Sequence, residues 1–103
     1  GRGCDPQDIR IYQWPSGFAG MNIPQFTVQI VNEAWQANAV YQVRISCRGF
    51  ATTTYIDPRV LRRLDMEVCL VREGGKMRPG DVISFVYSNM LKFPLYVLDL
   101  KCL

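Results

Sequence analysis

The chain has 103 residues, of which 49% are hydrophobic and 20% are charged, and its formal net charge is +3. This length and composition predict one folded domain with a single core, residues 1–103, rather than a disordered chain. The basic residues form no long run with interleaved aromatic residues, so nucleic acid is not an expected partner. No apolar stretch approaches the roughly 20 residues of a membrane helix, so we expect no membrane insertion.

Histidine is absent, and the four cysteines, Cys4, Cys47, Cys69 and Cys102, are widely spaced. The lack of histidine removes the commonest general base, so we expect no enzyme, no catalytic residue and no cofactor. Because no Cys-x-x-Cys pair occurs, a metal site is not predicted either. An even number of cysteines in a small chain favours disulfides and an oxidising compartment. No secretory signal is present, so we expect a mature or trimmed form.

Alternation of apolar and polar residues predicts the first two strands. The first covers residues 9–14. Pro15 to Pro24 is typical of a loop, in which Phe18 and Met21 are either exposed or tucked beneath the loop. In the second strand, residues 26–30, we expect Phe26, Val28 and Ile30 to point inward.

The next stretch contains Trp35, which we expect to cover one end of the core. A third strand, residues 39–47, places Tyr41, Val43 and Cys47 on one inward face together with Ala39 and Ile45. Residues 51–56 predict a short fourth strand.

Residues 57–64 predict the only helix of the chain. Asp57 can cap its start, and Pro58 is tolerated at the first helical position. Val60, Leu61 and Leu64 then share one face at helical spacing, and this face must dock on the core because so short a helix is unstable alone.

Three further strands follow the helix. Residues 66–71 form the fifth, 82–88 the sixth with Ile83, Phe85 and Tyr87 inward, and 95–102 the seventh. In the seventh, Leu98, Leu100 and Cys102 share one face. Turns at 73–76 and 78–81 separate these strands. The whole pattern predicts an all-β fold: an antiparallel two-sheet β-sandwich of about seven strands with one short helical turn.

We expect all four cysteines to be oxidised. The third and seventh strands are expected to run in the same direction, which would bring Cys47 close to Cys102 and leave Cys4 for Cys69. The alternative pairing, Cys47 with Cys69 and Cys4 with Cys102, stays open.

Several motifs together resemble the plant tapetum determinant family. They span nearly the whole chain in order: Gly3-Cys4 through Asp8-Ile9 to Gln13, Ile45-Ser46-Cys47 with Gly49-Phe50, residues 57–64, Cys69-Leu70-Val71, residues 83–89, and residues 93–97 with Cys102. The family usually has two further cysteines where this chain has residues 32–38, and a glycine where it has Arg48. The two missing cysteines are easiest to understand as partners of each other, which would leave two disulfides here.

The resemblance implies a protein secreted to the apoplast. It also implies an extracellular signalling ligand for the ectodomain of a leucine-rich-repeat receptor kinase, acting in tapetum specification in anthers. We predict that Arg59, Arg62 and Arg63, the densest charge on the chain, form the contact surface, with Phe93 and Tyr96 nearby. The simpler interpretation is that these arginines pair with neighbouring carboxylates and only solubilise the turn. The oligomeric state is not predicted.

A second function class is a cell-wall or glycan-binding module without catalytic activity. Exposed aromatic side chains on a sandwich could stack against sugar rings. The candidates are Tyr12, Trp14, Trp35 and Tyr96.

Overall fold

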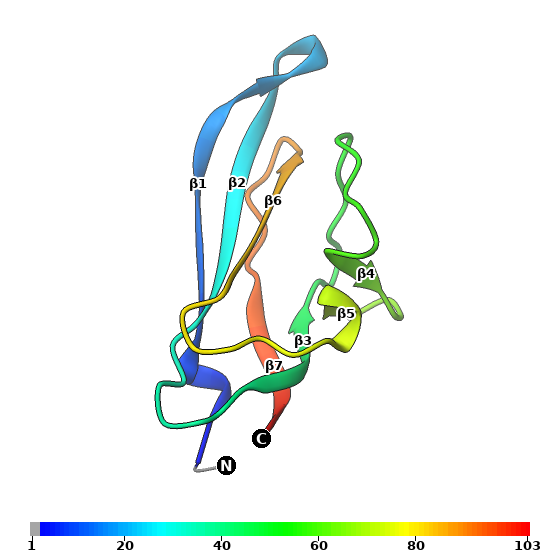
Figure 1. The fold of residues 1–103 in the computed structure, drawn as a ribbon. Coiled ribbons are helices and arrows are strands. Elements are labelled where there is room, and N and C mark those ends of the chain that lie inside the picture. Colours follow the sequence, from blue (N-terminus) through cyan, green and yellow to red (C-terminus); the bar gives the residue numbers. More distant parts are fainter. Residues whose placement is uncertain (1–2) are drawn as a thin grey trace.

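The structure is a computed structural model that describes residues 3–103. Within this range the chain forms seven strands: β1 (Ile9–Ala19), β2 (Ile23–Asn32), β3 (Val40–Ser46), β4 (Leu61–Arg63), β5 (Val68–Val71), β6 (Val82–Ser88) and β7 (Tyr96–Cys102). Three single 3-10 turns, η1 (Pro6–Asp8), η2 (Gly20–Asn22) and η3 (Arg72–Gly74), complete the regular structure. The strands pair antiparallel in two sheets, β1-β2-β6 and β4-β5-β3-β7 (Figure 1). The predicted all-β, two-sheet fold is confirmed.

The core lies between the inner faces of the two sheets. Of the residues predicted to point inward from the second and sixth strands, Phe26, Val28, Ile30, Phe85 and Tyr87 are buried, whereas Ile83 is only partly buried. Tyr87 stacks on Phe26 at 5.2 Å between ring centroids and meets the ring edge of Phe50. Its hydroxyl group donates to Gln13 Oε1 at 2.6 Å and accepts from the Phe93 N–H at 3.0 Å. This satisfied network lets a polar phenol occupy the centre of the core, and burial raises the pKa of Tyr87.

The first hairpin is much longer than predicted. β1 continues through Pro15 to Ala19, and β2 begins at Ile23, so most of the expected loop is strand. A register shift between Pro15 and Phe18 absorbs the irregular residues, and Gly17 takes a φ of 110° there. Pro15 is compatible with β1 because β1 is an edge strand. The N–H groups on its outer side need no partner, so a residue without an N–H group is tolerated there.

Bulges change which residues face the core in β3 and β7. In β3 the bulge lies at Gln42, which has a φ of 52°. On the N-terminal side of this bulge, Val40 is fully buried, whereas Tyr41, which was predicted to point inward, is not. In β7, Asp99 pairs with Arg44 while Val97 pairs with Ile45, so Leu98 is an extra residue and is 39% exposed. An extra residue reverses the alternation beyond it, which a strict period of two does not anticipate.

The predicted helix at residues 57–64 is wrong beyond its first turn. The Asp57 carbonyl accepts from the N–H groups of Val60 and Leu61, at 2.8 and 3.1 Å, and the chain then enters β4. β4 pairs with β5, which gives these residues interstrand hydrogen bonds that two isolated helical turns could not match. The predicted fourth strand at 51–56 is instead a loop, tied to Ser88 through the hydroxyl groups of Thr53 and Thr54 at 2.6 Å.

All four cysteines are paired, as predicted, but in the alternative arrangement. Cys4 bonds to Cys102, with 6.1 Å between Cα atoms, and Cys47 bonds to Cys69, with 5.8 Å. The favoured pairing is wrong because β3 and β7 are antiparallel neighbours, which places Cys102 opposite Val40 at the far end of β3 from Cys47. One disulfide therefore joins the chain termini, and the other joins β5 to the end of β3.

Candidate functional site

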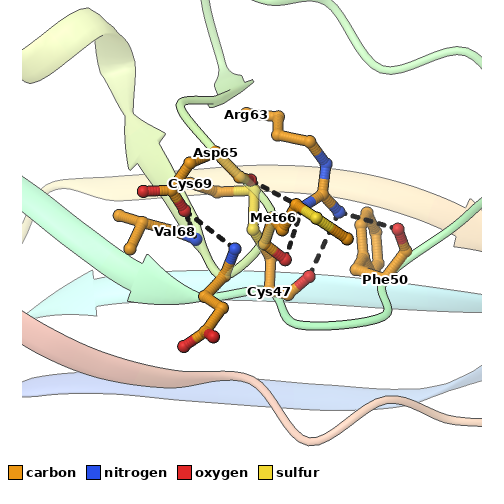
Figure 2. Close-up of a disulfide and its surroundings, with 8 residues drawn as sticks. Cys47, Phe50, Arg63, Asp65, Met66, Val68 and Cys69 are labelled. Atoms are coloured by element: carbon orange, nitrogen blue, oxygen red, sulfur yellow. Dashed lines mark hydrogen bonds between the residues drawn. A yellow bond between two sulfur atoms is a disulfide. The ribbon is translucent and has the colours of Figure 1, made fainter.

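Arg63 belongs to the disulfide region rather than to a free charged patch. Its guanidinium donates to four backbone carbonyl groups: Asp65 at 2.9 Å, Met66 at 3.1 Å, Cys47 at 3.1 Å and Phe50 at 2.8 Å. Figure 2 shows the guanidinium beside the Cys47–Cys69 disulfide, with dashed lines to these carbonyls. Arg63 therefore fastens the loops on both sides of the disulfide, and its two Nη groups are occupied.

We expect Arg63→Ala to lower the free energy of unfolding by about 2 kcal/mol, because it leaves several carbonyl groups without a charged donor. Arg62→Ala is the matched control. The Arg62 side chain is about half exposed and, among residues 3–103, forms an ion pair only with Glu73, at 3.2 Å, so its loss should change stability by less than about 0.5 kcal/mol. Chemical denaturation of both variants measures the difference. Equal midpoints for the two variants would contradict this role for Arg63.

Arg59 lies on the turn that precedes β4. Its guanidinium forms a bidentate pair with Asp57, with Nη2–Oδ2 at 2.7 Å, yet its side chain is 78% exposed. The guanidinium and the Arg59 backbone N–H together hold the pKa of Asp57 below its usual value. Arg59 thus pairs with a neighbouring carboxylate, whereas Arg62 pairs with the more distant Glu73, and both side chains stay accessible.

The outer face of the four-stranded sheet gathers Arg62 and Tyr96. Directly opposed residues share a face, so Arg62, Leu70, Arg44 and Asp99 form one row across the four strands. Arg44 Nε bonds to Asp99 Oδ1 at 2.8 Å, which lowers the pKa of Asp99. Tyr96, 57% exposed, opposes Ser46 in the adjacent row. Arg62 and Tyr96 lie on the two edge strands, three strand spacings or roughly 14 Å apart.

Phe93 is separate from this face. Its ring packs edge-on against Phe50 at 5.4 Å and lies 6.0 Å from the Tyr87 ring, at the rim of the core. The structure thus brings Arg59 and Arg62 to one edge of the outer face and Tyr96 to the other, whereas Arg63 and Phe93 have packing roles.

Sequence patterns did not predict an apolar end formed by three loops. Figure 1 shows the β1–β2 turn, the 51–56 loop and the loop after β6 at the same end of the molecule. The Asn89 N–H donates to the Pro24 carbonyl at 3.1 Å, and the Asn89 side chain donates to the Ala51 carbonyl at 3.1 Å. The exposed side chains of this end are Phe18 (70%), Met21 (95%), Tyr55 (80%), Met90 (71%) and Leu91 (68%). Exposed apolar groups on separate loops have no periodicity that a sequence pattern could reveal.

The loop at 32–38 is held without a cysteine. Asn32 is fully buried, and its side chain donates to the Met77 carbonyl and accepts from the Ala34 N–H, both at 2.8 Å. Trp35 does not cover the core as expected, because 68% of it is exposed. Its ring lies against Gly80, where a Cβ atom would be 3.7 Å away.

Among residues 3–103, no three side chains of the His, Cys, Asp and Glu types gather as a metal site would require. No helix in the same range is long and apolar enough to cross a membrane.

The geometry describes a small disulfide-linked β-sandwich whose distinctive features are exposed surfaces. A family model described as "Tapetum determinant 1, C-terminal" matches residues 5–103, so the chain belongs to the tapetum determinant 1 family. It is 33% identical over 102 residues to TPD1 protein homolog 1 of Arabidopsis thaliana, covering 99% of this chain and 57% of that relative. It is 36% identical over 99 residues to TPD1 protein homolog 1B of Oryza sativa subsp. japonica, covering 96% and 58%.

The chain therefore spans little more than half the length of these two relatives. No solved structure matches it.

Proposed function

We propose that this protein is a secreted signalling ligand that acts in the apoplast. Its partner in this proposal is the ectodomain of a plant leucine-rich-repeat receptor kinase, and its role is in anther and tapetum cell-fate specification. The observation that carries the proposal is the family match over residues 5–103. Two disulfides support it, because such bonds persist in oxidising compartments such as the cell exterior.

The contact surface in this proposal is the outer face of the four-stranded sheet together with the preceding turn. Arg59 and Arg62 supply accessible guanidinium groups, and Tyr96 supplies a half-exposed aromatic ring. Arginine and tyrosine are the residue types that most often carry interface energy. Both arginines are already held by carboxylates on a rigid sheet edge, so little side-chain ordering is lost on binding. Arg63 and Phe93 do not contact the partner in this proposal, because Arg63 is bound to backbone carbonyl groups and Phe93 packs at the rim of the core.

We expect Arg59→Glu/Arg62→Glu to weaken binding to a leucine-rich-repeat receptor ectodomain by about 100-fold, and Tyr96→Ala by about tenfold. Surface plasmon resonance at two salt concentrations measures this, and the parent should bind more weakly at high salt. Arg78→Glu, a charge reversal in the loop before β6, is the control and should bind like the parent. Unchanged affinity of the folded Arg59→Glu/Arg62→Glu variant would place the interface elsewhere.

A non-catalytic cell-wall or glycan-binding module is the second candidate function. Tyr12 and Trp14 favour it, because they lie two residues apart on the outer face of the three-stranded sheet and are 42% and 41% exposed. Their register partners on that face, Gln29 and Thr27, carry neutral polar groups that suit sugar hydroxyls. Retention on cellulose or on a glycan array that Trp14→Ala abolishes would favour this function over the first.

A further inference from the structure

The open edge of β1 carries backbone groups without partners. The Glu33 N–H donates to the Asp8 carbonyl at 2.8 Å. The next pair along the β1–β2 ladder, Ile9 with Asn32, is therefore a non-hydrogen-bonded pair. Because such pairs recur every second residue, the N–H and C=O groups of Ile11 and Gln13 point away from β2. Pro15 falls in the same series, where its missing N–H costs nothing.

No strand within residues 3–103 covers this edge. β1 is the outermost strand of its sheet, and β7, the nearest edge of the other sheet, pairs only with β3. In the described part of the chain, none of the hydrogen bonds outside the ladders uses the backbone of Ile11 or Gln13. A strand edge whose backbone groups are unpaired is a template for another strand, and the stretch from Ile9 to Trp14 has such an edge.

A groove runs beside these backbone groups. Two cavities of about 440 and 690 Å³ lie end to end, since both are lined by Ile11 and Leu95. One wall of the groove is β1, and the other is the segment from Lys92 to Val97. The two apolar residues Ile11 and Leu95 line both cavities, and the β1 wall runs from Ile9 to Trp14, so an extended segment of about six residues would lie along it.

The charges of the groove are of one sign. Arg10 lines the first cavity and Lys92 the second, and no carboxylate lines either. Neither basic side chain has an ion-pair partner among the described residues. A ligand with acidic groups near both ends would therefore be complementary to the groove.

We propose that the open edge of β1 binds an extended peptide segment of a partner protein by antiparallel strand addition. Backbone hydrogen bonds to Ile11 and Gln13 supply the pairing. The peptide residues opposite Ile11 and Gln13 have apolar side chains, which point into the groove toward Leu95. The peptide residues between them place their side chains beside Tyr12 and Trp14. Acidic residues near the two ends of the segment pair with Arg10 and Lys92. This binding site shares Tyr96 with the proposed receptor surface but uses a different strand edge, and its test uses no receptor.

The probe is a capped seven-residue peptide of alternating valine and threonine with a glutamate at each end. Its titration into isotope-labelled protein, followed by nuclear magnetic resonance, should shift the amide signals of Ile11 and Gln13 and slow their hydrogen exchange. In antiparallel pairing the groove-facing valines present their N–H groups to β1. N-methylation of the valines should therefore weaken binding by at least about tenfold, whereas N-methylation of the threonines should leave it nearly unchanged.

A charge exchange tests the ends of the groove. Arg10→Glu/Lys92→Glu should weaken binding of the glutamate-ended peptide by about tenfold, and a lysine-ended peptide should restore it. Arg78→Glu should have no effect on either peptide. No binding of the parent peptide at millimolar concentration, or equal binding of all N-methylated forms, would overturn the proposal. The same shifts on concentrating the protein alone would assign the edge to a second copy of this chain, which also overturns it.

Discussion

Replacing both residues of the terminal disulfide, Cys4→Ser/Cys102→Ser, is expected to lower the free energy of unfolding by about 5 kcal/mol. The bond closes a loop with a sequence separation of 98 residues, and in the chain-entropy model the stabilisation grows with loop length. Domains of this size are stable by only about 5–15 kcal/mol, so the variant should be near the limit of folding at 37 °C. Denaturant titration followed by tyrosine and tryptophan fluorescence measures the loss.

The second disulfide provides the comparison. Cys47→Ala/Cys69→Ala opens a loop with a separation of 22 residues, for which the same model gives about 3 kcal/mol. Both of these cysteines are buried, so their replacement by alanine also removes packing contacts. This loss of packing adds to the loss expected from the loop length. A terminal-disulfide variant as stable as the parent would contradict the expected contribution of that bond.

Leu61→Asp is expected to cost at least about 4 kcal/mol, because it places an unpaired carboxylate in the core. Leu61 is 7% exposed and faces inward from β4, where it pairs with Val71. Leu64→Asp is the matched control. Leu64 is 47% exposed, just beyond β4, so the same substitution should cost less than about 1 kcal/mol.

This pair of variants also distinguishes strand from helix. In the helix that the sequence pattern predicts, Leu61 and Leu64 share a docked face, and both substitutions would be severe. In β4, only Leu61 meets the core. Thermal unfolding by circular dichroism gives the two losses. Equal, large losses would contradict the strand.

The strands that the alternation predicted best are those whose neighbours keep a regular ladder. Val28 and Ile30 in β2 and Phe85 and Tyr87 in β6 are buried as expected, because an unbroken period of two fixes which face a side chain takes. Bulges at Gln42 and Leu98 remove this regularity, and neither residue type announces a bulge. The family resemblance, which rests on motifs in order, is confirmed by the match to residues 5–103.

For the candidate contact residues as well, the sequence predicts part of the result and the tertiary structure decides the rest. Three arginines close together are visible in the sequence, but their different roles follow from β4, in which Arg62 and Arg63 point to opposite faces. Arg62 therefore lies on the outer surface, whereas Arg63 meets the carbonyl groups of Cys47 and Phe50, 16 and 13 residues away in the chain.

The sequence by itself determined the fold class and the oxidation of all four cysteines, because these depend on periodicity and count. Only the tertiary structure decided which cysteines pair, since that depends on the antiparallel placement of β7 beside β3. It also decided that residues 61–63 are strand. Their conformation is set by hydrogen bonds to β5 rather than by their own propensity, and a partner strand supplies what a short isolated helix lacks.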